Sequence, residues 1–180
     1  MKLIPMVVAV AAFSLLAGCD VTVPVLISVE AVATANDTAM DAGLLGTWEE
    51  QGNKDLVAVI RMADSGGYQI SILSGGSVMT FGAKVFFVKE SEFLDLAPTD
   101  DNDFRIPGHA VVRIWTDGAA LRWSFLDSDW LKQKAAGLTA HSADGKMQIF
   151  APAATVRAFI AAYGTDDQAY GKVATWVRVP

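Results

Sequence analysis

The stretch YQISILSGGSVMTFGA, residues 68–83, alternates apolar and polar side chains on both sides of the pair Gly75-Gly76. A Gly-Gly pair between two such runs is typical of a two-residue hairpin turn. With that turn, apolar residues face one another in three successive pairs, which are Ile72 with Met79, Ile70 with Phe81, and Tyr68 with Ala83. Ser71 then faces Thr80 on the other side, and a slip of one residue would exchange the two faces. The stretch therefore predicts an antiparallel hairpin with one buried face.

A second hairpin is predicted at residues 110–125, AVVRIWTDGAALRWSF, around a type I′ turn at Asp117-Gly118. Its apolar pairs are Ile114 with Leu121, Val112 with Trp123, and Ala110 with Phe125. The opposite face carries Trp115 and places Arg113 directly opposite Arg122. Like charges that face each other across a sheet are unfavourable, so this pair predicts an anionic neighbour. That neighbour is either the carboxylate or phosphate head of a ligand or a nearby acid such as Asp127 or Asp129.

The rest of the chain is predicted to form further short strands, at residues 47–50, 56–62, 85–88, 93–96, 138–141, 146–150 and 173–179. Asp127 or Ser128 is expected to cap a short helix. One longer helix is predicted between Pro152, which suits a first helical turn, and Gly164, which suits a helix end. Its apolar residues recur at helical spacing, at Val156, Phe159, Ile160 and Tyr163.

This order of elements predicts an all-β fold, an antiparallel up-and-down β-barrel with one C-terminal α-helix before the last strand. Closure into a barrel is favoured because it removes the unpaired edges that many short strands would otherwise expose. Another small antiparallel barrel and a β-sandwich are the alternatives.

The N-terminus carries the most specific motif. Lys2 precedes an apolar run that is too short to span a bilayer, and the run ends at Leu16-Ala17-Gly18-Cys19, which resembles the lipobox of bacterial lipoproteins. The resemblance implies that the chain is cut before Cys19 and that this residue is acylated on its thiol and its new amino group. Several acyl chains anchor a protein to a lipid bilayer stably. We therefore expect a lipid-anchored protein of the bacterial cell envelope that faces the periplasm, and Asp20 favours the inner membrane.

The motif divides the chain into three parts: residues 1–18 as signal peptide, 19–36 as the lipidated Cys19 with a tether, and 37–180 as a single β-barrel domain. The tether is unusually apolar, so it is expected to pair as an edge strand or to lie against the domain.

Without Lys2 the mature chain has 13 basic and 20 acidic residues, a net charge of −7. This acidic balance argues against nucleic-acid binding, which depends on neutralising phosphates.

The triplet Gly46-Thr47-Trp48 enters the first predicted barrel strand, and a strand meander, one helix and a last strand follow it. Over roughly residues 37–180 this order resembles the lipocalin-type barrel of the calycin group. The resemblance implies that Trp48 closes one barrel end beneath an arginine near the last strand, in a cation–π stack, and Arg178 matches that arginine. The Asp-x-Tyr loop of that family has no convincing counterpart in this sequence.

No pattern in the sequence selects a catalytic or metal site. The two histidines, His109 and His141, lack the spacing of metal ligands, and the single Cys excludes a multi-thiolate centre. The acidic run at residues 100–103 does not fit a calcium loop, since Ile106 stands where such a loop needs Gly. Five strand-region acids could supply a carboxylate pair, but spacing selects none of Glu49, Glu50, Glu90, Glu92 and Asp95. We expect no enzyme activity, no metal and no cofactor.

Two functions are compatible with these features. The first is a membrane-tethered, lipocalin-like binder of a small apolar or amphipathic ligand inside the barrel, with Arg113, Arg122 and Trp115 as candidate ligand-binding residues. The second is a non-enzymatic protein-interaction or inhibitor module of the cell envelope whose barrel is filled by its own side chains. The volume of the barrel interior distinguishes them, because ligand pockets measure about 300 to 1,000 Å³.

Overall fold

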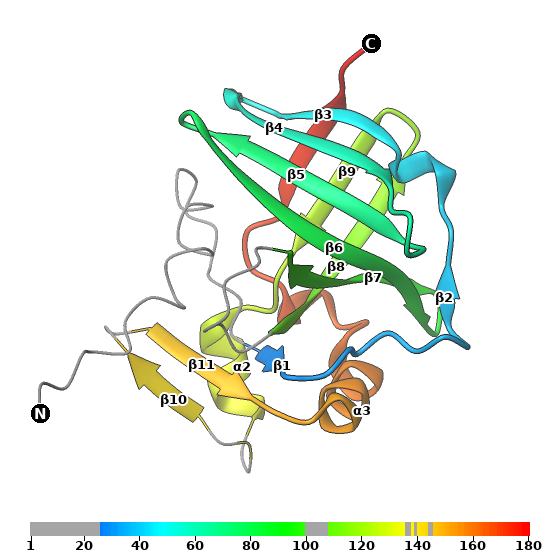
Figure 1. Ribbon diagram of the computed structural model, residues 1–180. Coiled ribbons are helices and arrows are strands. Elements are labelled where there is room, and N and C mark those ends of the chain that lie inside the picture. The colour runs from blue at the N-terminus through cyan, green and yellow to red at the C-terminus, as the bar shows by residue number, and fades with distance from the viewer. Residues whose placement is uncertain (1–25, 100–107, 136–137, 139, 144–145) are drawn as a thin grey trace, which may run out of the picture.

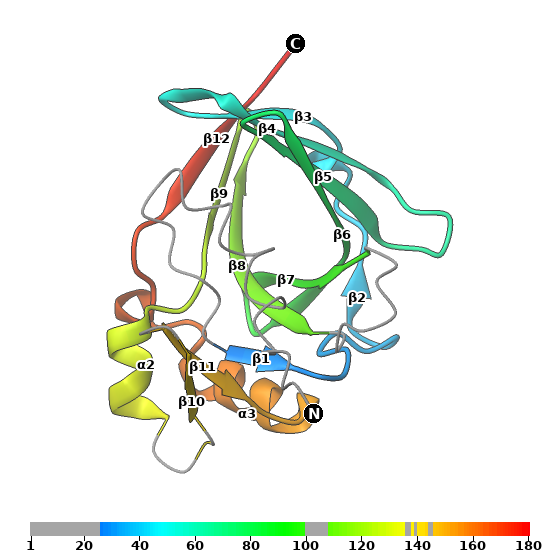
Figure 2. The same cartoon turned by 60° about the vertical axis from the view of Figure 1, so that its left-hand side comes forward.

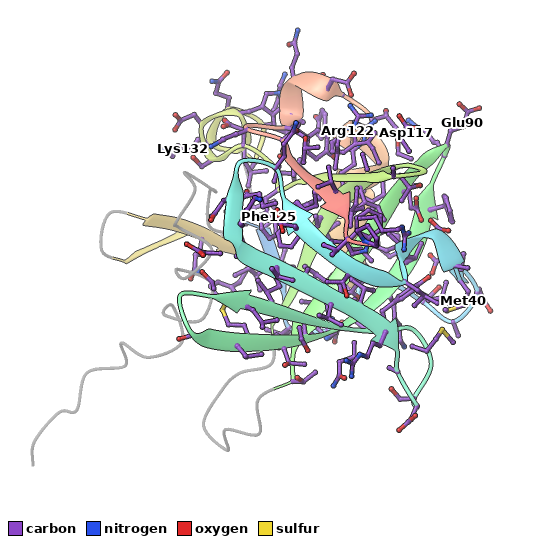
Figure 3. All side chains as sticks on the ribbon, turned by 90° about the horizontal axis from the view of Figure 1, so that it is seen from above. Met40, Glu90, Asp117, Arg122, Phe125 and Lys132 are labelled. Atoms are coloured by element: carbon purple, nitrogen blue, oxygen red, sulfur yellow. The ribbon has the colours of Figure 1, made fainter. Side chains whose placement is uncertain are left out.

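The computed structural model describes residues 26–99, 108–135, 138, 140–143 and 146–180 (Figure 1). Eight antiparallel strands form a closed barrel. In ring order they are β3 (Gly46–Glu50), β4 (Asn53–Met62), β5 (Tyr68–Ser74), β6 (Ser77–Val88), β7 (Ser91–Pro98), β8 (His109–Asp117), β9 (Ala120–Ser124) and β12 (Ala174–Arg178). β12 pairs with both β9 and β3 and closes the ring that Figure 2 shows. The predicted all-β fold and antiparallel barrel are confirmed.

The register predicted for residues 68–83 is confirmed. β5 and β6 pair Ile72 with Met79, Ile70 with Phe81 and Tyr68 with Ala83, as the alternation predicts. Gly75 and Gly76 have φ angles of 54° and 82°, in the region that L side chains rarely adopt. The Gly-Gly turn therefore fixes which side chains of this hairpin enter the barrel.

The register predicted for residues 110–125 is wrong by two residues. Asp117 pairs with Ala120, so the turn consists of Gly118 and Ala119, with Gly118 at a φ angle of 52°. A type II′ turn places Gly at this first position. Because a shift of two residues keeps every side chain on its own face, the apolar pattern does not distinguish the two registers. Arg113 consequently faces Ser124, and Arg122 faces Trp115, so the two arginines are not opposed.

Two hydrophobic cores result. Inward side chains of the barrel strands form the first, which includes Trp48, Ile70, Phe81, Val112 and Trp176. The second lies outside the barrel, between the outer faces of β6 to β8 and a covering layer. That layer consists of β1 (Leu26–Ser28), α2 (Ser128–Lys134), β10 (Ala140–Ala143), β11 (Lys146–Phe150) and α3 (Ala153–Tyr163), which lie together below the barrel in Figure 1. Smaller elements complete the fold: β2 (Thr38–Ala39), the 3₁₀ turn η3 (Ala42–Leu44) and the 3₁₀ turn η4 (Asp167–Ala169).

The two helices follow the capping signals in the sequence. The Asp127 carboxylate accepts hydrogen bonds from the backbone N–H groups of Asp129 and Trp130, which starts α2. α3 follows Pro152, ends at Gly164 and buries Val156, Phe159 and Ile160. The predicted helix before the last strand is thereby confirmed, and it packs on the outside of the barrel.

The folded part of the chain begins earlier than residue 37. β1 pairs with β8 and with β11, and Leu26 and Ile27 are buried. The segment that follows, residues 29–37, is here called the strap; it buries Val32 and Ala33 against the outer wall of the barrel. This part of the expected tether therefore pairs as a strand and lies against the domain, because its apolar side chains are stabilised by burial.

Candidate functional site

The barrel interior is filled by its own side chains. The described residues leave an apolar cavity of about 60 Å³, lined by residues that include Ile60, Ile72, Phe81, Trp123 and Trp176. The ring of Trp123 lies edge-on to Phe125 and also beside Trp176, with centroid distances of 5.5 and 6.5 Å. Because ligand pockets measure about 300 to 1,000 Å³, this cavity is several-fold too small for a fatty acid or a similar molecule.

A tryptophan and an arginine stack on each other where β3 begins and β12 ends, at the end of the barrel that is here called the closed end. Trp48 and Arg178 are direct partners in the β3–β12 register, and the Arg178 guanidinium carbon lies 4.3 Å from the centre of the Trp48 ring. Arg178 also donates hydrogen bonds to the carbonyl oxygens of Leu45 and Gly43. A Cβ on Gly46, whose φ angle is 133°, would lie 2.6 Å from Arg178, so only Gly fits there. The structure thus brings Gly46, Trp48 and Arg178 together.

The turn η3 lies across the same end. The indole N–H of Trp48 donates to the carbonyl oxygen of Leu44 at 2.8 Å. The Tyr68 hydroxyl accepts from the backbone N–H of Asp41 at 2.6 Å and donates to the Asp41 carbonyl at 3.1 Å. Burial raises the pKa of Tyr68, which keeps this hydroxyl protonated. The closed end is therefore held by side chains from three strands, β3, β5 and β12.

A titratable carboxyl group also belongs to this end. Glu92 alternates along β7 with the core residue Leu94, which places its side chain on the inner face. Its Oε1 is buried and has no hydrogen-bond partner among the described residues. Burial and, to a lesser degree, the negative charge of Asp41 raise the pKa of Glu92 to about 7. Near neutral pH this group exchanges a proton inside the barrel, and its ionised form is poorly solvated.

The candidate ligand residues Arg113, Arg122 and Trp115 do not enter the barrel. Arg113 lies on the outer face, where its guanidinium stacks on Trp115 at 4.7 Å and on Tyr170 at 5.1 Å. Its Nη1 donates to an oxygen of Asp167 at 2.9 Å. Arg122 is exposed on β9. The acid that compensates Arg113 therefore comes from η4, and Arg113 binds this turn to the barrel.

A buried carboxylate on the outer wall, that of Asp95, was not selected by the sequence. The carboxylate of Asp95 is 2% exposed and lies 2.8 Å from Nδ1 of His109. Its other oxygen accepts the backbone N–H groups of Val32 and Ala33 at 2.8 and 2.9 Å. One signal for it exists in the sequence, since Asp95 interrupts the otherwise apolar run Phe93-Leu94-Asp95-Leu96. Its partners lie 14 and more than 60 positions away, so spacing does not reveal them.

Several expectations concern residues outside the described ranges. Cys19 and the acidic run at residues 100–103 are among them, and the side chain of His141 is not described. In the part of the chain that is described, no group of three His, Cys, Asp or Glu side chains is arranged to hold a metal ion. None of the described helices has the length and apolarity needed to cross a bilayer. Comparison with protein-family models, with curated proteins and with solved structures finds no match.

Proposed function

We propose that this chain is a lipid-anchored, lipocalin-like lipoprotein of the bacterial envelope that acts as a protein-interaction module. The observation that carries the proposal is the filled barrel, whose residual cavity of about 60 Å³ leaves no site for a ligand of ordinary size. The stacked Trp48 and Arg178 support the lipocalin-like assignment, since they take the positions that the resemblance implies. No enzymatic step is proposed.

An aliphatic row on the outer wall supports the interaction role. The row consists of four aliphatic residues in cross-strand register: Val177 of β12, Val57 of β4, Leu73 of β5 and Val78 of β6. Glu49 of β3 lies between Val177 and Val57. Leu73 is 40% and Val78 62% exposed. Apolar side chains that adjoin one another on a surface are typical of contact sites for other proteins. We assign this aliphatic row to a protein partner in the envelope.

The proposed anchor leaves the aliphatic row accessible. Cys19 lies seven positions before Leu26, and an extended chain covers at most about 3.5 Å per residue, so the anchor would hold β1 within about 25 Å of the bilayer. β1 lies at the bottom of Figure 1, whereas β3, β4 and β5 lie at the top. An anchor near β1 would therefore keep the aliphatic row on the side away from the membrane.

The second candidate function is the binding of a small apolar ligand inside the barrel. The apolar lining of the cavity favours it, because a dry apolar cavity binds small apolar molecules. Its volume restricts this function to molecules much smaller than a fatty acid.

Site-specific cross-linking tests the interaction role. A photoreactive side chain at position 78 should give one discrete adduct with the same envelope protein in repeated preparations. The control position is Lys132, which lies on α2 and is exposed. Adducts formed equally from positions 78 and 132, or from neither, would remove the aliphatic row as a contact site. The anchor is tested separately, since Cys19→Ser should release the chain from the membrane fraction.

A further inference from the structure

A groove of about 610 Å³ runs along the outer wall of the barrel. One wall contains Ala31 of the strap, and the other contains Asp64 and Ser65 of the turn between β4 and β5. Small residues of β6 and β7, Gly82 and Ala97, form its floor. A Cβ on Gly82 would lie 3.7 Å from the Thr99 side chain, at ordinary van der Waals distance, so the groove accepts a side chain at this position without a clash. The groove is separate from the barrel interior and from the aliphatic row.

The polar end of the groove contains His109 and Asp95. The Asp95 carboxylate already accepts two backbone N–H groups and faces Nδ1 of His109. Nδ1 of His109 lies 2.8 Å from an oxygen of this carboxylate, so this nitrogen is occupied by Asp95. The other ring nitrogen, Nε2, is then the one that His109 offers to the groove.

A lysine lines the same groove. Lys84 of β6 is the direct cross-strand partner of Asp95, on the outer face, and its side chain is exposed. Within the described part of the chain its ammonium group makes no hydrogen bond or ion pair. The other charged group of the groove is Asp64, on the opposite wall, and Gln69 and Thr99 are neutral. Lys84 and His109 therefore flank a carboxylate whose oxygens are already occupied.

We infer that this groove binds a small organic anion, with a carboxylate or phosphate head between Lys84 and His109 and an apolar remainder over Ala97 and Met62. The Lys84 ammonium offers N–H donors to an oxyanion, as does Nε2 of His109 when the ring is protonated, and charge-assisted hydrogen bonds of this type are among the strongest in proteins. The groove is larger than an inorganic ion, and Met62 and several alanines line it beside its polar residues. The inference is independent of the interaction role proposed above.

Nuclear magnetic resonance of the histidine rings tests the inference, because the chain has only two histidines. Inorganic phosphate and phenyl phosphate would be added to the full chain in detergent at pH 6.0, where an ordinary imidazole is mostly charged. The His109 ring signals, assigned with His109→Gln, should shift along a saturating curve, and those of His141 should not. Phenyl phosphate should bind several-fold more tightly than phosphate, since its ring adds apolar contact in the groove.

Three variants separate a site from general charge effects. Lys84→Gln should weaken binding of phenyl phosphate at least tenfold. Lys54→Gln removes an equally exposed lysine from β4, outside the groove, and should change binding less than twofold. Gly82→Val places a strand-compatible side chain in the groove and should reduce the preference for phenyl phosphate over phosphate. Folding of each variant is checked by its thermal midpoint.

Three results would overturn the inference: no saturable shift at His109, equal shifts at His109 and His141, or equal losses in Lys84→Gln and Lys54→Gln. Replacing phosphate by acetate and phenyl phosphate by benzoate distinguishes the two head groups. Stronger binding of the carboxylates would assign the site to organic acids, and stronger binding of the phosphates to phosphate esters.

Discussion

The closed end of the barrel predicts a measurable coupling between Trp48 and Arg178. Trp48 is 1% exposed, and truncation of a large buried aromatic to Ala costs about 3 to 5 kcal/mol of unfolding free energy. Arg178→Ala loses a partly desolvated cation–π contact, about 1 to 2 kcal/mol, and two hydrogen bonds to backbone carbonyls, about 0.5 to 1.5 kcal/mol each. We expect a total loss of about 2 to 5 kcal/mol for Arg178→Ala.

Urea unfolding of both single variants and the double variant measures the coupling. The double variant should lose about 1 to 2 kcal/mol less than the sum of the two single losses, because the cation–π contact is counted in both. Arg122→Ala is the matched control, since Arg122 is exposed and should change stability by less than about 0.5 kcal/mol. Additive losses of Trp48→Ala and Arg178→Ala within about 0.3 kcal/mol would show that the stack contributes no energy, and the argument for the closed end would fail.

Three further variants follow from the same contacts. Burial raises the pKa of Glu92 from 4.5 to about 7, so the ionised form of this group destabilises the folded state. The unfolding free energy of the parent chain should therefore fall between pH 4.5 and 7. Glu92→Gln should remove this fall and should raise the unfolding free energy at pH 8 by about 1 to 2 kcal/mol, after allowance for partial exposure. An unchanged pH profile would mean that Glu92 is solvated. Arg113→Gln should destabilise the protein by about 1 to 3 kcal/mol, since it removes stacking on Trp115 and the contact with Asp167. If Arg113 and Arg122 faced each other, the same change would raise the stability, and such a rise would contradict the observed register. Cys19→Ser should leave the unfolding midpoint unchanged and abolish membrane fractionation, and persistent fractionation would exclude the lipid anchor.

Local sequence patterns predicted those parts of the fold that depend on a single turn or on the alternation of apolar and polar residues. The Gly75-Gly76 turn fixed the register of β5 and β6, because both positions require positive φ angles. The second hairpin allowed two registers that bury the same faces, and only the observed pairing of Asp117 with Ala120 separates them.

The outer wall and the interior volume depend on contacts between distant residues. The Asp95 carboxylate contacts His109 on the next strand and accepts a backbone N–H of the strap. These groups are distant in the sequence and meet only because of the order of the barrel strands. The free space in the barrel is the small difference between its volume and that of its side chains. The apolar pattern of the second hairpin predicts that Trp123 and Phe125 face the interior, but only the packing of these rings, with Trp176 beside Trp123, shows how little space they leave.

The filled barrel is tested most directly by native mass spectrometry of the protein purified from its own cell envelope in mild detergent. A filled barrel on a lipid-anchored chain predicts a mass equal to the mature chain plus the acyl groups on Cys19, with no further small molecule bound. A non-covalent ligand of several hundred daltons would contradict the filled barrel if it binds inside the barrel. The variant Ala58→Phe tests this, because it adds a large side chain to the cavity lining and should displace a ligand bound there. A parent chain and an Ala58→Phe chain that each show only their own covalent mass, with the acyl groups, would agree with a barrel that carries no ligand.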